Sequence, residues 1–439
     1  MSLTTIEVEK YNVHNLLAKE RLCIPGYQRP YKWQKKNVLA LIKDIQHSLD
    51  QKQPAYRIGT VVLHKDESND KTELNIVDGQ QRLITITLIL FALGEQSTGL
   101  LDTEFIHAVS KENIRYNYQI IKNWFNDIGQ EEKTKFRNYL KDQCEFVTIT
   151  LNDISEAFQF FDSQNARGRS LTPYDLLKAF HLREIDIKEE AVKKLCAKNW
   201  EQAVENETLE LIIGSMMYRI RKWSKGVPAG IFSKDDIKEF KGITLRNQNY
   251  PYLKPYRLND ALVEQYQNDP VQKALGQVID FPYQLTQVIL NGKRFFEMVH
   301  HYTQMHEQLF KKNNGVFTTF YKDNTRYTGS GRAGDQYVLE LFQAITLTYV
   351  DRFGATGFEA IYEYLYMWAY RLRLENKSVR YQSIDNYCLN RGNAFKKMTN
   401  YFYAEDSLAI RQHVNPDKKD RKIETVENVF TKKGIKLPT

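Results

Sequence analysis

Residues 76–86 read IVDGQQRLITI, and this stretch decides how the first part of the chain folds. Its opening isoleucine and valine are typical of a strand, and the Asp78-Gly79 pair that follows is a turn signal. The apolar run over residues 83–93 is too long for an ordinary buried strand and ends at a glycine, which favours a helix. The sequence therefore predicts a strand, a tight turn and a helix that begins near Gln80.

The strand before this turn is predicted to pair with the segment that precedes it. Residues 56–64 (YRIGTVVLH) are rich in β-branched side chains, a polar stretch follows, and residues 73–77 (ELNIV) complete the antiparallel pair. Further upstream, apolar residues recur at the spacing of an amphipathic helix: Val38, Ile42, Ile45 and Leu49. Residues 1–185 therefore read as a small α/β domain.

Residues 186–439 read as a mostly α-helical domain with a basic C-terminal tail. One helical stripe within it is formed by four apolar residues: Ile361, Leu365, Trp368 and Leu372. Residues 245–260 and 322–337 are polar and contain Pro or Gly, so they are expected to be loops. The predicted fold class is α+β.

Composition narrows the class of protein. The 439 residues carry 62 Lys and Arg against 54 Asp and Glu, a net charge of +8 that suits an acidic partner such as nucleic acid or a nucleotide. The four cysteines form no CxxC pair, which predicts neither a zinc cluster nor a disulfide framework and is typical of a reducing cytoplasm. No signal-peptide pattern and no apolar run of membrane-spanning length is present. We therefore expect a cytoplasmic protein without a membrane partner.

The chemistry of the Asp78–Arg82 turn supports two interpretations. A helix that begins near Gln80 directs its first free N–H groups at the turn, Gly79 lets the backbone approach a ligand, and Arg82 adds a fork that matches phosphate. Asp78 can hold a metal-bound water or orient an arginine, and the amides of Gln80 and Gln81 can contact phosphate oxygens or a water. The alternative is a strand-to-helix turn in which the aspartate caps the helix and the arginine pairs locally.

Two other turns combine arginine with an amide side chain, and one of them also holds aromatic residues. Residues 24–33 (IPGYQRPYKW) hold two basic residues, one amide and three aromatics, which can stack a base and clamp phosphate or pack the loop onto the sheet. Residues 165–171 (NARGRSL) place a glycine between two arginines. This arrangement fits an anion-binding site, and it also fits two arginines that are simply exposed to solvent. Thr172, Pro173 and Asp175 then fit the start of a helix. The basic residues around Trp223 are interpreted as a solvated helix face.

Taken in order, three segments resemble the N-terminal domain of the GmrSD-type modification-dependent restriction proteins: IPGYQRPYKW, IVDGQQRLITI, and FQFFDSQNARGRSLTPYDLLKAF. The resemblance covers about residues 10–185. It implies a fold similar to the ParB and sulfiredoxin nucleotide-binding domains. It also implies a role in bacterial defence against phage DNA, often DNA with modified bases or backbone.

The resemblance further implies binding and hydrolysis of a nucleoside triphosphate (NTP), with Mg²⁺ at Asp78. The implied catalytic residues are Asp78, Gln80, Gln81 and Arg82. The implied nucleotide-binding residues come from all three turns: Tyr27, Gln28, Arg29, Gly79, Asn165, Arg167 and Gly168. The helical region would contact DNA or a nuclease subunit, so that the chain acts as the NTP-hydrolysing sensor or regulator of a restriction system.

One departure from that family concerns the nuclease. Many relatives carry an HNH-like nuclease domain, and here only residues 413–416 (HVNP) match part of its pattern, close to the chain end and without the expected Gly-Asn-Leu element. We interpret this match as chance. Two rival functions stay open: a non-enzymatic DNA-binding module, and a self-sufficient nuclease that uses the C-terminal region.

Overall fold

The computed structural model describes residues 6–25, 28, 30–66, 72–95, 99–101, 105, 108–152, 172–186, 189–205, 208–246, 249–275, 281–312, 315–416 and 423–437. The chain divides into two units, each with its own interior. Unit 1 comprises Met1–Leu182 with Glu189–Lys198, and unit 2 comprises Arg183–Lys188 with Asn199–Thr439. The sequence predicts the boundary at residue 185.

Unit 1 contains a mixed five-stranded sheet. Its strands are β1 (Glu7–Asn12), β2 (Leu22–Cys23), β3 (Tyr56–Asp66), β4 (Glu73–Asp78) and β5 (Cys144–Leu151). The order across the sheet is β1-β5-β3-β4-β2. The outer pair β1–β5 and the hairpin pair β3–β4 are antiparallel, whereas β3–β5 and β2–β4 are parallel. The end of β4, which carries the Asp-Gly turn, thus lies beside the centre of the sheet.

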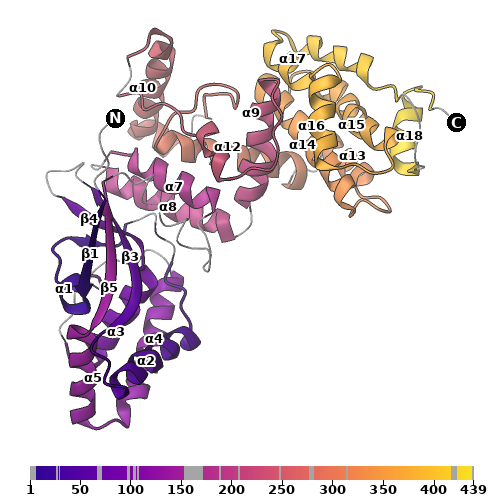
Figure 1. Ribbon diagram of the computed structural model, residues 1–439. Coiled ribbons are helices and arrows are strands. Elements are labelled where there is room, and N and C mark those ends of the chain that lie inside the picture. Colours follow the sequence, from indigo (N-terminus) through magenta and orange to yellow (C-terminus); the bar gives the residue numbers. More distant parts are fainter. Residues whose placement is uncertain are drawn as a thin grey trace. The chain divides into compact units, whose positions relative to one another are not determined.

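The described helices of unit 1 are α1 (Val13–Leu17), α2 (Lys35–Asp50), α3 (Gln80–Ala92), α4 (Ala108–Asn126), α5 (Gln130–Asp142), α7 (Pro173–Arg183) and α8 (Glu190–Glu205), which runs on into unit 2. Helices α2, α3 and α4 lie together beside the sheet (Figure 1). Helix α3 is apolar on nearly every side and is buried through most of its length, from Leu83 to Leu90. Burial of this helix fixes where its N-terminus, and hence the turn, is held.

The local predictions for unit 1 are confirmed. The antiparallel pair, the helix after the Asp-Gly turn and the amphipathic helix over residues 35–50 all form as expected. The start of α7 is capped as predicted, because Asp175 N donates to Thr172 Oγ1 at 3.2 Å and Thr172 N donates to Asp175 Oδ2 at 2.8 Å. The third predicted turn, residues 165–171, lies outside the described residues.

Unit 2 is mostly helical, so the expected α+β class is confirmed for the chain as a whole. Its described elements are η2 (Glu210–Met217), α9 (Tyr218–Ser224), η3 (Lys234–Glu239), η4 (Pro251–Leu253), α10 (Lys254–Asn268), α11 (Pro270–Ala274), α12 (Lys293–Glu307), η5 (Gln308–Lys312), α13 (Val316–Thr325), α14 (Ala333–Phe353), α15 (Phe358–Glu375), α16 (Tyr381–Asn390), α17 (Ala394–Asn400), η6 (Ala404–His413) and α18 (Glu424–Lys432). The apolar stripe predicted on α15 is buried. No helix within the described ranges is both long enough and apolar enough to span a bilayer.

Several predictions for unit 2 are wrong. Residues 322–325 and 333–337, expected to be loop, lie in α13 and α14, and Asp335 in the first turn of α14 pairs with Arg332 at 2.8 Å and Arg373 at 2.9 Å. Residues 254–260, expected to be loop, form the first half of α10. The proline in this stretch, Pro255, lies in the first turn of the helix, where a residue without an N–H is tolerated.

The basic face around Trp223 is solvated only in part. Arg219 and Arg221 are buried, where Arg219 pairs with Glu340 at 2.6 Å and Arg221 with Glu239 at 3.0 Å, whereas Lys225 is exposed. Acidic partners far away in the sequence allow these guanidinium groups to be buried.

The basic C-terminal segment is packed against unit 2 in part, although its positive charge suggests a solvated tail. Helix α18 buries Val426, Val429 and Phe430 against the rest of unit 2, and Lys433 pairs with Glu363 of α15. His413 lies at the end of η6, where its carbonyl oxygen accepts from Arg371 Nη1 at 2.9 Å. Within the described residues, no group of three His, Cys, Asp or Glu side chains could hold a metal ion. The described contacts of the HVNP segment are thus with the rest of unit 2.

Candidate functional site

The Asp78–Arg82 turn joins β4 directly to α3. Gly79 is the N-cap residue with a φ of 96°, a left-handed conformation that favours glycine, and a Cβ there would meet Val61 Cγ2 at 2.9 Å. The first bond of the helix runs from Leu83 N to Gly79 O at 2.9 Å, and no side chain caps the end. Three backbone N–H groups, those of residues 80–82, therefore point out of the helix with no hydrogen-bond partner among the described residues.

Arg82 lies in the first turn of α3 and is held against the sheet. Its Nη2 donates to the Thr60 carbonyl oxygen at 2.9 Å and lies 3.2 Å from Asp78 Oδ2. Gly59 makes room for the guanidinium, since a Cβ there would meet Arg82 Nη1 at 2.0 Å. Within the described part of the chain, Nε and Nη1 donate no hydrogen bond. Because the side chains of Asp78 and Arg82 are 27% and 26% exposed, a ligand at the turn can reach them.

The side chain of Gln81 forms hydrogen bonds to the loop of residues 24–33. Its Oε1 accepts from the backbone N–H of Lys32 at 2.9 Å and of Trp33 at 3.2 Å, and its Nε2 donates to the Pro30 carbonyl oxygen at 3.1 Å. The carboxamide is thus engaged by the aromatic loop rather than open to a phosphate or a water. Gln80 is buried, and among the described residues its side chain makes no hydrogen bond.

The aromatic loop of residues 24–33 is fastened to the same turn. Gln28 Nε2 donates to the carbonyl oxygens of Ile76 and Val77, both at 2.7 Å, at the end of β4. The resemblance implies that Gln28 binds the nucleotide, and in the structure its amide fastens the loop to the end of β4. Of the other expected binding residues, Tyr27, Arg29, Asn165, Arg167 and Gly168 lie outside the described residues. The structure therefore brings together two of the three predicted turns.

Three anchor residues of this loop were missed by the sequence analysis. Tyr31 is fully buried, and its hydroxyl lies 2.8 Å from Thr85 Oγ1 of α3 and accepts from Asn117 Nδ2 of α4 at 3.1 Å. Burial raises the pKa of the Tyr31 phenol, so the hydroxyl stays protonated. Asn117 Nδ2 also donates to the Trp33 carbonyl oxygen at 2.7 Å. The sequence signal was a polar residue within each of two helices, Thr85 and Asn117. Such a signal can be interpreted only once the hydrogen-bond partners in the folded protein are known.

Replacing Gln81 by alanine is expected to loosen this loop. The change removes three hydrogen bonds and leaves the backbone N–H groups of Lys32 and Trp33 without their acceptor, at a cost of about 1–3 kcal/mol. Thermal unfolding of the purified variant measures the loss. Among the described residues the amide of Gln46 on α2 bonds only to Asp50 on the same helix, at 2.8 Å, so Gln46→Ala is the matched control and should change stability little. Equal melting temperatures for both variants would contradict the anchoring role.

The residues at the turn fit the phosphates of a nucleotide better than a metal ion alone. Three outward N–H groups and the unused donors of Arg82 suit an anion. Asp78 is the turn's single carboxylate among the described residues, and a protein site of one carboxylate holds Mg²⁺ only when phosphates and waters complete the shell. A metal ion would therefore arrive with the nucleotide, and Asp78 is the residue that would hold it.

Comparison with known families agrees with this arrangement. The mixed sheet, the Asp-Gly-Gln-Gln-Arg turn and the helical second unit define the class, an α+β protein whose residues 13–182 match the GmrSD restriction endonuclease N-terminal domain. Residues 192–426, more than half of the chain, match a family of unknown function, DUF7834, and the chain belongs to that family. None of the curated proteins compared with the chain matches it.

The expected resemblance is thereby confirmed over nearly the predicted range. The N-terminal match implies a component of a modification-dependent restriction system, a class associated with restriction enzymes. Neither matched region is an HNH nuclease domain.

Proposed function

We propose that unit 1 binds and hydrolyses an NTP at the Asp78–Arg82 turn, and that the chain is the sensor or regulator of an anti-phage restriction system acting on modified DNA with a nuclease partner. One observation carries the proposal most directly. The N-terminus of α3 is uncapped, and beside it lies an arginine already fixed by Asp78 and the Thr60 carbonyl oxygen with donors left over.

Each residue of the turn has a defined task in this proposal. The N–H groups of residues 80–82 and the Arg82 guanidinium bind phosphate oxygens, and they need little reorganisation because the helix and the ion pair already hold them. Asp78 orients Arg82 and would hold Mg²⁺, which supplies positive charge against the phosphates when bound. Gln81 and Gln28 position the loop of residues 24–33, which would cover the nucleotide.

Two of the implied roles are therefore reassigned. Gln81 becomes a residue that positions the loop rather than one that contacts phosphate. Gln28 also becomes a positioning residue, because it fastens the loop to the end of β4. Gln80 keeps its proposed place beside the attacking water, since its carboxamide makes no hydrogen bond within the described residues. Tyr27, Arg29, Asn165, Arg167 and Gly168 stay predictions for the rest of the pocket wall.

A hydrolysis assay on the purified full-length chain tests the proposal. Release of phosphate from each of the four NTPs is measured with Mg²⁺, in the presence and absence of DNA with modified bases. We expect turnover of at least one NTP and a change in its rate when the modified DNA is added. DNA binding without turnover would favour the non-enzymatic module instead, and metal-dependent DNA cleavage by the chain alone would favour the self-sufficient nuclease.

A further inference from the structure

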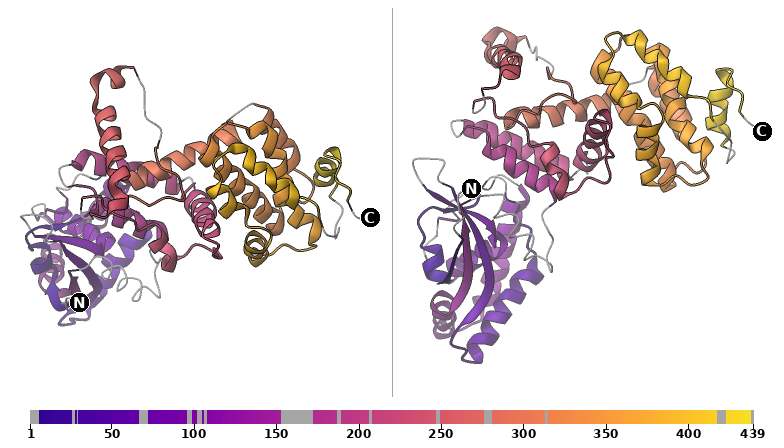
Figure 2. Two further views of the ribbon diagram at one scale, coloured as in Figure 1. Left: turned by 90° about the horizontal axis from the view of Figure 1, so that it is seen from above. Right: turned by 45° about the horizontal axis from the view of Figure 1, so that its top comes forward.

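An open pocket lies in unit 1 between the helices α3 and α4, which pack against each other. Its volume is about 410 Å³. The helices of this part of unit 1 can be followed beside the sheet in the right-hand view of Figure 2. Six apolar or aromatic side chains from the two helices and the segment between them line the pocket: Leu88, Phe91, Leu101, Phe105, Ile114 and Tyr118.

The apolar wall of this pocket is accessible to a ligand. Phe91 is 43% exposed, although the helix to which it belongs is largely buried. The centre of its ring lies 5.6 Å from that of Tyr118, so the two rings form one side of the pocket. A dry apolar cavity of about 150 Å³ accommodates one benzene molecule, so a pocket of about 410 Å³ has room for roughly ten to sixteen carbon atoms of a ligand.

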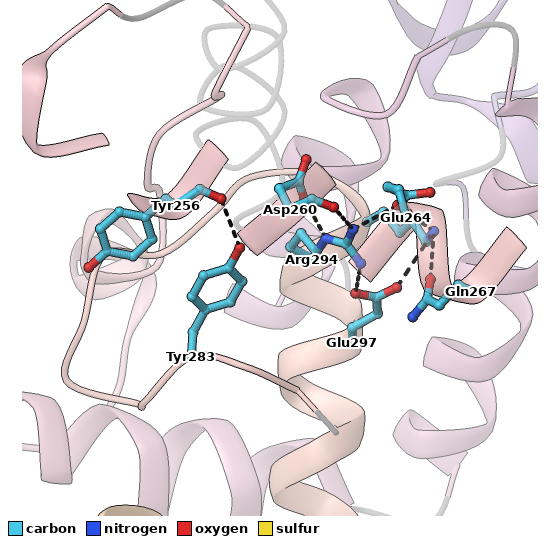
Figure 3. A network of polar contacts seen from close by, with 8 residues as sticks. Tyr256, Asp260, Glu264, Gln267, Tyr283, Arg294 and Glu297 are labelled. Carbon is cyan, nitrogen blue, oxygen red and sulfur yellow. Dashed lines mark hydrogen bonds and ion pairs between the residues drawn. The ribbon is translucent and has the colours of Figure 1, made fainter. Parts of the chain in front are cut away.

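Two basic residues of α4 complete the wall. Lys111 and Arg115 both line the pocket, are exposed and lie one helical turn apart. Among the described residues, neither side chain forms an ion pair or a hydrogen bond. Arg294 of unit 2 is a contrasting case, because three carboxylates surround its guanidinium at 2.6 or 2.7 Å (Figure 3). The cations at the pocket are thus available to an acidic group that enters from outside.

We propose that this pocket binds a small amphipathic acid, a molecule with a hydrocarbon body and one acidic head group. The apolar side chains bury the body, and Lys111 and Arg115 hold the head group at the rim. The combination selects this class of ligand, since a neutral hydrocarbon would leave the two cations unused. A nucleobase would place its polar edges against side chains that are mostly hydrocarbon, without hydrogen-bond partners.

A neighbouring face of α4 holds the loop of residues 24–33, so an occupied pocket can act on the proposed nucleotide site; this step rests on the proposed function. Ser110 Oγ accepts from Tyr31 N at 3.0 Å, and Asn113 Nδ2 donates to the Tyr31 carbonyl oxygen at 3.0 Å. Asn117 Nδ2 donates to the Trp33 carbonyl oxygen at 2.7 Å. A ligand that steadies this part of α4 therefore steadies the loop as well.

Calorimetric titration of the full-length chain with dodecanoate tests the site without any nucleotide. We expect saturable binding of one molecule per chain below the micelle concentration. Dodecanol has the same body without the charge, and hexanoate has the same charge on half the body, so both should bind at least 10-fold more weakly. Monododecyl phosphate shows which acidic head group is preferred. No saturable binding of either twelve-carbon acid, or equal affinity for dodecanol and dodecanoate, would overturn the proposal.

Matched variants locate the ligand. Phe91→Glu places a carboxylate in the apolar wall and should abolish binding, whereas Tyr116→Glu, at a residue of α4 that is 57% exposed and does not line the pocket, should not. Lys111→Gln combined with Arg115→Gln should weaken dodecanoate binding about 10-fold and leave dodecanol binding unchanged. Lys122→Gln alters an exposed lysine farther along α4 and is the control. All these residues are exposed, so melting temperatures should stay unchanged, and dodecanoate binding that every variant retains would contradict the assignment.

The segment between α3 and α4 carries two acids of its own, Asp102 and Glu104, which lie outside the described residues. Asp102→Asn combined with Glu104→Gln should change the affinity for dodecanoate less than twofold if the two cations serve an outside ligand. A 10-fold or greater gain in affinity would instead assign Lys111 and Arg115 to these acids and overturn their role in the proposal.

Hydrogen exchange measured by mass spectrometry tests the link to the loop, again without nucleotide. Dodecanoate should slow exchange in peptides that contain the amides of Lys32 and Trp33, which bond to Gln81. The affinity for dodecanoate should also rise with NTP bound, by the factor by which dodecanoate raises the affinity for NTP. Binding of dodecanoate with unchanged exchange would overturn the link to the loop. A chain that binds dodecanoate and slows exchange but binds no NTP would overturn the proposed function and not the pocket.

Discussion

Replacing Arg82 by alanine is expected to weaken NTP binding about 10- to 150-fold, which corresponds to 1.5–3 kcal/mol for the loss of charged hydrogen bonds. The physical reason is that Arg82 is the turn's fixed cation, with Nη2 held by the Thr60 carbonyl oxygen and Asp78 and the remaining donors directed at a ligand. Calorimetric titration of the full-length chain with each NTP measures the change. Unchanged affinity in a folded Arg82→Ala variant would remove the turn from the binding site.

Two further variants separate this effect from general damage to unit 1. Arg137 also forms an ion pair, at 3.6 Å from Glu95, and its side chain is 30% exposed, so Arg137→Ala is a matched control that should bind NTP normally. Gly59→Ala keeps Arg82 but inserts a Cβ that would lie 2.0 Å from Nη1, at a φ of 152° that favours glycine. It should therefore displace the guanidinium and lower affinity as Arg82→Ala does.

The sequence predicted those parts of the fold that neighbouring residues determine. The Asp-Gly turn, the hairpin that leads into it and the cap at Thr172 depend on contacts within a few residues, and each formed as expected. The pairing of β1 with β5 joins segments about 140 residues apart in the chain, for which no local pattern exists. The local pattern also predicted a loop at residues 254–260, where tertiary ion pairs to Arg294 stabilise a helix.

In the candidate site, too, features that depend on neighbouring residues could be predicted, and features that depend on distant residues could not. The five residues of the turn could be chosen from sequence because glycine, arginine and a helix start have a known chemistry at that spacing. The space that Gly59 leaves for Arg82 could not, because it depends on how β3 lies beside α3. The role of Gln81 could not be deduced either, since its partners in residues 30–33 come from a loop about 50 residues earlier.

Replacing Asp78 by asparagine is expected to separate turnover from binding. Asparagine keeps the shape of the side chain and can still accept a hydrogen bond from Arg82, which also keeps its bond to the Thr60 carbonyl oxygen. Phosphate binding should therefore weaken only a few-fold. Turnover should fall about 100-fold or more, because the negative charge that would hold Mg²⁺ or orient a water is lost.

Parallel measurement of kcat and of nucleotide affinity decides between these effects. Asp175→Asn is the matched control, since this aspartate is another carboxylate of unit 1 at the start of a helix and bonds to Thr172 within its cap. Asparagine also serves well in such helix-start turns, so the control should change neither quantity. If Asp78→Asn reduced affinity and turnover by the same factor, Asp78 would act only by holding Arg82 in place, and the charge needed for hydrolysis would have to come from another residue.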